Sequence, residues 1–131
     1  MSVGLLLLTH SGIGSSLLGT AMSFIKESEF STRVLTIEQD CDPEKLQQQV
    51  MDLIEELNSG KGVLVFTDLV GSTPSNIASS CMLNNAVRVV TGLNLSMLIK
   101  VLNYPQASLS ELVTKAIEGG VEGVMKIEAN N

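Results

Sequence analysis

The sequence predicts an α/β fold in which helices cover both faces of a mainly parallel, doubly wound sheet. Short, continuously apolar runs, typical of strands buried on both faces, alternate along the chain with longer segments whose apolar residues recur at helical spacing. Polar turns that contain Gly or Pro separate the two kinds of segment. The length of 131 residues suits one domain, so we expect residues 1–131 to form a single unit.

The first strand and helix give the clearest pattern. Residues 3–8 are apolar or Gly without alternation and predict a buried strand. After Gly12 and Gly14 the apolar residues return at helical spacing. They are Ile13, Leu17, Leu18, Ala21, Phe24 and Ile25. We expect the turn between strand and helix to hold His10, the only histidine of the chain.

Two further strand–helix pairs follow. Residues 33–37 and 63–66 predict the second and third strands. Asp42 followed by Pro43 is typical of a helix start, and Gly60 is placed to end that helix. The next helix opens at Pro74 and is expected to run to residue 82.

The last third predicts a strand at residues 86–90, a short helix at 95–102 and a final helix. Ser108 and Glu111 have the spacing of a capping box and begin this final helix. Its expected apolar face comprises Leu112, Val113, Ala116, Ile117, Val121, Val124 and Met125. The pattern also contains Gly119, Gly120 and Gly123, and each Gly costs a helix about 1 kcal/mol relative to Ala. A helix tolerates them best where a neighbour packs very close or where it bends.

The connections predict the sheet order 2-1-3-4 if the first crossover runs one way and the later ones the other. The point at which the direction reverses then lies between strands one and three, where open parallel sheets bind ligands. This order places the turn at His10 beside the turn at Asp68.

Composition excludes several classes of function. A net charge of -6 without clustered Lys or Arg argues against a nucleic-acid partner. The chain has no run of eighteen apolar residues and no signal peptide, so we expect no membrane insertion. Cys41 and Cys81 fit a reducing compartment as small, partly buried side chains. One histidine and two distant cysteines leave no zinc spacing, and we expect no metal and no cofactor.

The two turns together favour phosphoryl chemistry. A carboxylate at Asp68 that accepts a hydrogen bond from one imidazole nitrogen of His10 leaves the other nitrogen as a nucleophile. The helix starts that follow the two turns offer N–H groups to an anion, and Ser72 and Thr73 add hydroxyl donors. These groups suit a phosphoryl group carried on His10 without a metal.

Structural explanations for the same residues stay open. His10 can simply hydrogen-bond a turn, Asp68 can be a turn acceptor, Gly71 can supply a tight turn, and Thr73 can be the N-cap before the next helix. A dinucleotide site is a weaker alternative, because the G-x-G at residues 12–14 lacks its third Gly. The chain has no P-loop, and residues 12–16 do not match the G-x-S-x-G of serine hydrolases.

Three segments carry a resemblance to a known family. Residues 7–11 (Leu-Leu-Thr-His-Ser), 67–76 (Thr-Asp-Leu-Val-Gly-Ser-Thr-Pro-Ser-Asn) and 92–98 (Gly-Leu-Asn-Leu-Ser-Met-Leu) resemble the mannose-type EIIA domain (mannose/fructose/sorbose family) of the bacterial phosphoenolpyruvate:sugar phosphotransferase system. The resemblance covers nearly the whole chain, in order and at matching spacing.

The resemblance implies a cytoplasmic phosphocarrier, usually a homodimer, that serves sugar uptake. Such a carrier takes a phosphoryl group from the histidine carrier protein HPr and passes it to an EIIB domain, in association with a membrane permease complex. His10 matches the phosphorylated histidine, Asp68 its partner carboxylate, and Thr73 the position that contacts the phosphoryl group. We expect Ser72, Gly71 and Ser11 to surround the same group.

The sequence departs from the family pattern in four places. Ser72 stands where the family usually has a second Gly, and it either tightens the turn or adds a donor. Ser96 stands where Pro is frequent. We expect no fused EIIB domain and no long C-terminal extension that exchanges a strand between subunits. A regulatory phosphoprotein, in which phosphorylation of His10 controls binding to a target without sugar transport, is the alternative function.

Overall fold

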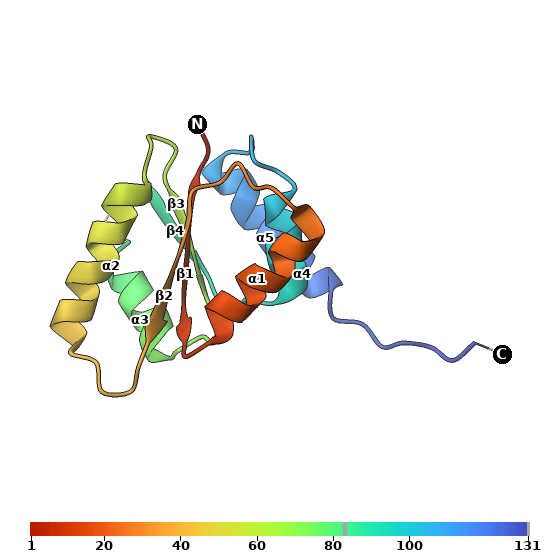
Figure 1. Cartoon of the computed structure of the whole chain (residues 1–131), viewed down its shortest axis with the longest axis horizontal. Helices are drawn as coiled ribbons and strands as arrows, with labels where there is room; N and C mark the ends of the chain where they lie inside the picture. Colours follow the sequence, from red (N-terminus) through yellow and green to blue (C-terminus); the bar gives the residue numbers. More distant parts are fainter. Residues whose placement is uncertain (83, 131) are drawn as a thin grey trace.

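The computed structural model of this chain describes residues 1–82 and 84–130 and has the expected α/β fold (Figure 1). Leu83 and Asn131, which belong to the expected domain, lie outside the described residues. Within that range the strands are all parallel and take the predicted order β2-β1-β3-β4. The elements are β1 (Gly4–His10), α1 (Ile13–Ile25), β2 (Thr32–Ile37), α2 (Pro43–Leu57), β3 (Val63–Thr67), α3 (Thr73–Ser80), β4 (Val87–Val90), α4 (Leu95–Leu102) and α5 (Leu109–Glu122).

Helices cover both faces of the sheet. In Figure 1, α2 and α3 lie on one face and α1, α4 and α5 on the other. The turns after β1, β2 and β3 all lie at the lower edge of this view, which is the carboxyl edge of the sheet. No helix in the described part of the chain is both long and apolar enough to cross a membrane.

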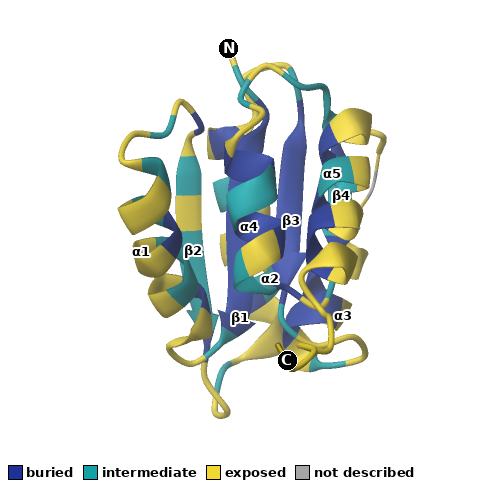
Figure 2. Ribbon diagram, turned by 90° about the vertical axis from the view of Figure 1, so that its right-hand side faces the viewer, coloured by how far each residue is buried: buried dark blue, intermediate teal, exposed yellow. Residues whose placement is uncertain are grey.

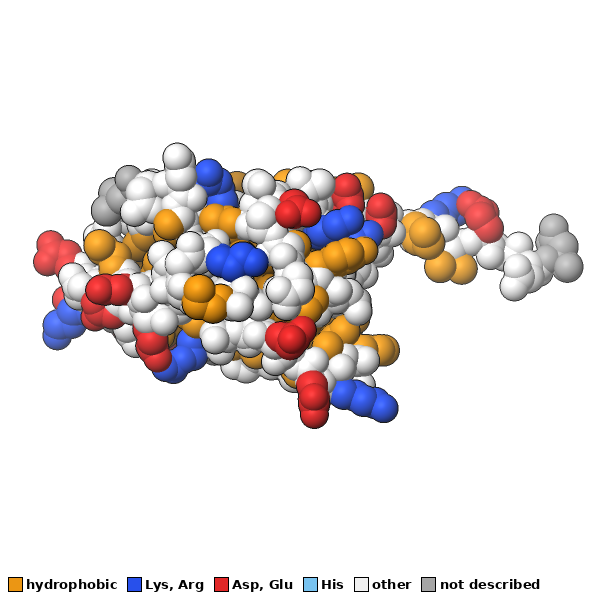
Figure 3. All heavy atoms as spheres, turned by 90° about the horizontal axis from the view of Figure 1, so that it is seen from above, with side chains coloured by type: hydrophobic (Ala, Val, Ile, Leu, Met, Phe, Trp, Pro, Cys, Tyr) orange, Lys and Arg blue, Asp and Glu red, His pale blue; other side chains and the backbone are white. Residues whose placement is uncertain are grey.

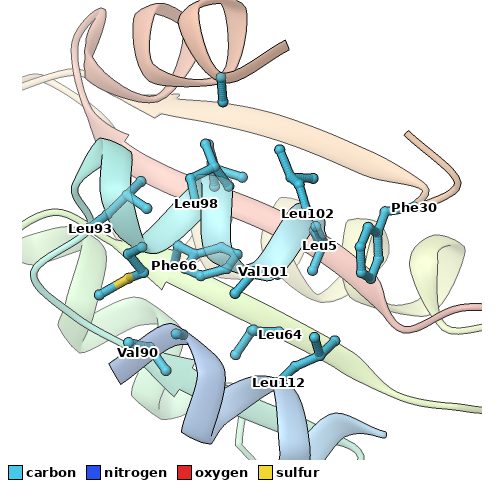
Figure 4. Packing of buried hydrophobic residues seen from close by; sticks show 14 of the residues in the cluster. Leu5, Phe30, Leu64, Phe66, Val90, Leu93, Leu98, Val101, Leu102 and Leu112 are labelled. Carbon is cyan, nitrogen blue, oxygen red and sulfur yellow. The ribbon is translucent and has the colours of Figure 1, made fainter. Parts of the chain in front are cut away.

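The central strands β1 and β3 hold the carboxyl edge of the sheet in place. Side chains of β1 and β3 are buried on both faces, as the dark blue strands of Figure 2 show. On the face toward α4 and α5, Leu64 and Phe66 of β3 pack in the same cluster as Leu98 of α4 and Leu112 of α5 (Figure 4). A dense apolar layer of this kind leaves little freedom for the strand ends to shift.

Several predicted helix boundaries need correction. The predicted helix face extended to Val124 and Met125, but α5 ends at Glu122 with Gly123 as its C-cap, so both residues lie outside the helix and are exposed. Similarly, α2 ends at Leu57 and not at Gly60, because the backbone leaves the helix at Asn58.

The helix after β3 differs at both ends. The residue Ser72 is its N-cap, and Thr73 is the first helical residue in place of the expected cap. It ends at Ser80, two residues before the predicted end at Met82. At the start of α2 the prediction was right, since the Asp42 side chain accepts a hydrogen bond from the backbone of Glu44 (3.1 Å). The capping box of Ser108 and Glu111 is also present.

Some residues of the predicted apolar helix faces are exposed. Phe24 on α1 is 65% exposed, and Ile117 and Val121 on α5 are 51% and 68% exposed. The spacing that predicted their helices was correct, but no part of the described chain covers these side chains. Exposed apolar groups that gather in one place are typical of contacts with another molecule.

The glycines of α5 allow it to approach α4 closely. A Cβ at Gly119 would lie 2.6 Å from Lys100 Cβ, and a Cβ at Gly120 would lie 2.8 Å from Met97 Cε. Real Cβ atoms do not approach other atoms this closely, so a larger residue at Gly119, which faces Cβ of Lys100, would push the helices apart, whereas at Gly120 the end of the Met97 side chain would have to move. The expectation that a neighbour packs very close to these glycines is confirmed.

This geometry predicts opposite effects for two Gly→Ala substitutions. Gly119→Ala should destabilise the fold by about 1–3 kcal/mol through overpacking against α4. Gly19→Ala on α1, where a Cβ meets nothing within 4 Å, should stabilise it by about 0.5–1 kcal/mol. Urea unfolding of both variants measures the free energies. Equal effects of the two substitutions would contradict the close packing of α4 and α5.

Candidate active site

His10 and Asp68 meet at the carboxyl edge of the sheet, as the predicted strand order requires. His10 is the last residue of β1, so it belongs to the strand and not to the turn. The two residues are 58 positions apart, yet His10 Nδ1 lies 2.8 Å from Asp68 Oδ2. The backbone N–H of His10 donates to the same carboxylate oxygen (3.1 Å). One oxygen of Asp68 therefore holds both the ring and the main chain of His10.

This contact defines the state of the His10 ring. An ionised carboxylate can only accept, so the shared hydrogen atom is on Nδ1. In the neutral ring the Nε2 atom then keeps its lone pair. The His10 side chain is 45% exposed, whereas the Asp68 side chain is only 9% exposed. The ring is therefore anchored from the inside and accessible from the outside.

The protonation of Asp68 results from two opposed effects. Burial alone raises the pKa of the Asp68 carboxyl, because a buried charge loses its hydration. The hydrogen bonds from the His10 ring, the His10 backbone and the Asp68 backbone, together with the charge of the ring, act in the other direction and hold the pKa below its ordinary value. Asp68 is consequently a carboxylate throughout the neutral range.

Two helix starts border the same edge. Gly12 is the N-cap of α1 and has a φ of 78°, and Gly71 in the loop before α3 has a φ of 77°. Both are left-handed conformations that favour glycine. Ser11 and Thr73 are exposed beside these two residues. The first N–H groups of a helix have no partner within it, so this edge offers neutral donors to an anion.

The geometry around Ser72 distinguishes its two expected roles. The Ser72 hydroxyl donates to the backbone carbonyl of Leu69, and the Ser72 N–H donates to the same carbonyl (3.3 Å). The side chain makes no cap hydrogen bond to α3. The hydroxyl therefore tightens the turn, and its proton is not directed to an anion.

The sequence analysis did not predict an exposed apolar rim beside the site. Leu69 and Val70 in the loop after β3 are 59% and 73% exposed, and Ile13 at the start of α1 is 40% exposed. The available signal was the pair of apolar residues inside an otherwise polar loop. Of the other residues considered from the sequence, Cys41 and Cys81 are free thiols; Cys41 is half-buried, as predicted, whereas Cys81 is buried.

A family model described as the PTS system fructose IIA component matches residues 4–117. The chain belongs to this family. Family membership makes it a IIA component of a sugar phosphotransferase system and confirms the resemblance inferred from the three segments.

Individual relatives agree with this assignment. The chain is 30% identical to the "PTS system mannose-specific EIIAB component" of Escherichia coli over 132 residues, which cover 98% of this chain and 41% of the relative. It thus spans less than half the length of that protein.

Two solved structures share the whole fold. The mannose/sorbose-specific IIA subunit of the phosphotransferase system from Enterococcus faecalis superposes with a TM-score of 0.87 at 26% identity, covering 100% of this chain and 98% of the other. The PTS IIA protein associated with the fucose utilization operon of Streptococcus pneumoniae gives a TM-score of 0.82 at 25% identity, covering 96% of each chain.

The lowered pKa of Asp68 predicts a pH dependence of stability. A carboxyl whose folded pKa is depressed stabilises the fold above its unfolded pKa, near 3.9, and loses that contribution as the pH falls through the lower folded value. We expect Asp68→Asn to be less stable than the wild type at pH 6 and this difference to shrink below about pH 4. Urea unfolding between pH 3 and 7 measures this difference, with Glu55→Gln at an exposed position of α2 as the control for loss of one charge. A difference that is the same at pH 3 and pH 6 would contradict the assignment.

Proposed function

We propose that this chain is a phosphoryl carrier in which His10 accepts a phosphoryl group from HPr and passes it to an EIIB component during sugar uptake. The observation that carries the proposal is the Nδ1–Asp68 hydrogen bond, which leaves Nε2 of an accessible ring as the nucleophile. The position at the sheet's switch point supports it. Family membership supports the choice of donor and acceptor.

The transfer needs no proton to leave His10. The Nε2 lone pair attacks phosphorus, the P–N bond to the donor histidine of HPr breaks, and its electron pair returns to that ring. His10 becomes a phosphoryl-imidazolium whose positive charge faces the Asp68 carboxylate, because the Nδ1 proton stays in the hydrogen bond. In the second step a nucleophile of EIIB attacks phosphorus, and the electron pair of the P–Nε2 bond returns to His10.

Neutral groups bind the phosphoryl oxygens in this proposal. Backbone N–H groups at the starts of α1 and α3 and the Thr73 hydroxyl are the donors, with Gly71 and Ser11 beside them. The loops at this edge, residues 11–12, 38–42, 68–72 and 91–94, contain no Lys or Arg. Donors without a full positive charge favour onward transfer over retention of the phosphoryl group.

The surface around His10 suits protein partners that bind transiently. The exposed rim of Ile13, Leu69 and Val70 offers apolar contact area next to the nucleophile. HPr and EIIB would dock on this rim in turn, since both must reach Nε2. We place this exchange in the cytoplasm, next to a membrane permease complex that receives the sugar.

A second apolar surface supports a homodimer. It combines Ile117 and Val121 of α5 with Val124, Met125 and Ile127 of the C-terminal segment, all of which are more than half exposed. The segment extends away from the body and carries hydrophobic side chains (Figures 1 and 3). Beside it, a groove of about 430 Å³ runs from Val90 at the end of β4 to α5. Because β4 is the last strand on its side of the sheet, its free edge adjoins this surface.

The phosphoryl transfer can be tested directly. Incubation with phosphoenolpyruvate, enzyme I and HPr should add one phosphate to the intact mass, and the adduct should be acid-labile and base-stable. The variant His10→Ala should fold normally and take up none, since a half-exposed side chain at a strand end contributes little packing. Full labelling of His10→Ala would exclude His10 as the acceptor.

Addition of purified EIIB to the phosphorylated protein then tests the second step. Rapid loss of the phosphate to EIIB is the expected result. A phosphorylated protein that transfers to none of several EIIB proteins would favour the regulatory role over sugar transport. No phosphorylation, with folded protein and active donors, would overturn the carrier function altogether.

The homodimer has its own test. Val121→Asp should shift the sedimentation equilibrium to the monomer, because it places a charge in the proposed interface. Phe24→Asp, at an apolar residue on α1 with 65% exposure, is the matched control and should leave the assembly unchanged. A monomeric wild type at about 100 μM would contradict the dimer, since stable interfaces of standard size persist at such concentrations.

A further inference from the structure

The Thr9 hydroxyl makes hydrogen bonds on both sides of the turn between β1 and α1. The residue is fully buried at the end of β1. Its Oγ1–H donates to the carbonyl of His10 (2.9 Å), and its Oγ1 accepts from the N–H of Gly14 (2.9 Å). One hydroxyl thus links the main chain of the strand that bears His10 to the first turn of α1.

The hydrogen bond to Gly14 replaces an ordinary helix cap. The N-cap of α1 is Gly12, which has no side chain to accept from the first N–H groups. Gly14 is the second helical residue, and its N–H is the one that an N-cap side chain often satisfies. Since Thr9 supplies the acceptor from inside the protein, the outer side of the helix start stays free of a capping side chain.

From this geometry we infer that Thr9 is a positioning residue for phosphoryl transfer on His10, an inference that rests on the proposed function. The N–H of His10 donates to Asp68 Oδ2 and its carbonyl accepts from Thr9 Oγ1. Both peptide groups of His10 are therefore fixed, the N–H by Asp68, which follows β3, and the carbonyl by Thr9 of its own strand. Thr9 acts through the main chain, which sets the direction of the ring and the position of the N–H groups that follow.

Thr67 provides a matched control within the same fold. It precedes Asp68 at the end of β3, as Thr9 precedes His10 at the end of β1, and it is also fully buried. Unlike Thr9, its hydroxyl has no hydrogen-bond partner among the residues that the structure describes. Both threonines are fully buried near the end of a central strand, and they differ in their hydrogen bonds.

The experiment compares three variants of the full chain with the wild type. Thr9→Val keeps the shape and removes both hydrogen bonds, Thr9→Ser restores the hydroxyl, and Thr67→Val removes a hydroxyl without a partner. The first readout is the single-turnover rate of phosphoryl transfer from HPr at saturating donor. The second is the ¹⁵N spectrum of the imidazole, which reports the share of the Nδ1–H tautomer and is unambiguous because the chain has one histidine.

We expect Thr9→Val to slow the transfer about tenfold or more, since displacement of a reacting group by a fraction of an ångström has effects of this size. The share of the Nδ1–H tautomer should fall in the same variant. Thr9→Ser and Thr67→Val should both stay within about threefold of the wild type, because loss of a methyl group or of an unpaired hydroxyl leaves the His10 main chain in place. A Thr9→Val variant with the rate and ring spectrum of Thr67→Val would overturn the inference.

The two readouts separate this inference from the proposed function. If the wild type takes up no phosphate, the carrier function fails, and the ring spectrum still decides whether Thr9 orients His10. If Thr9→Val does not fold, Gly14→Ala disturbs the same contact from the helix, because its Cβ would lie 3.0 Å from Thr9 Oγ1 and 3.0 Å from Val34 Cγ1. Wild-type rate and ring spectrum in Gly14→Ala would then overturn the inference.

Discussion

The register between β1 and β3 is the constraint on which the site depends. Leu8 and Thr67 are the last residues paired between β1 and β3, so His10 and Asp68 follow directly after the paired part of these two strands. A shift of one residue would send every side chain of a strand to the other face. Because β1 and β3 are buried on both faces, such a shift would disrupt both apolar layers at once. The core therefore holds the 2.8 Å contact between His10 and Asp68 in place.

The same contact organises the charges of the proposed reaction. Asp68 is ionised although it is nearly buried, because the hydrogen bonds from His10 outweigh the loss of hydration. Phosphorylation at Nε2 would place a positively charged ring between two anions, the carboxylate and the phosphoryl group. Each anion stabilises the ring, and the ring separates the anions. With neutral donors at the helix starts, the site needs no Lys or Arg to complete this arrangement.

Local patterns were sufficient to predict most elements, the strand order and the contact of His10 with Asp68. They failed where the outcome depends on contacts that spacing does not encode. The apolar spacing of α5 continues through Val124, yet the helix ends at Glu122. The exposure of Val121 could not be predicted either, because apolar residues at helical spacing give the same pattern whether their own chain or a second copy covers them. The role of Ser72 depended on the direction of one hydroxyl, which sequence leaves undetermined.

The two apolar surfaces differ in a way that suits different kinds of contact. The rim beside His10 consists of a few side chains on loops and a helix start, as expected for partners that must leave after each transfer. The surface on α5 adjoins a groove and a free strand edge, which is typical of lasting association. The groove reaches Thr91 and Gly92, and the next residue, Leu93, donates from its N–H to the carbonyl of Thr67 (3.0 Å). In the proposed dimer, a second copy seated in the groove would therefore contact the segment that is hydrogen-bonded to the residue before Asp68.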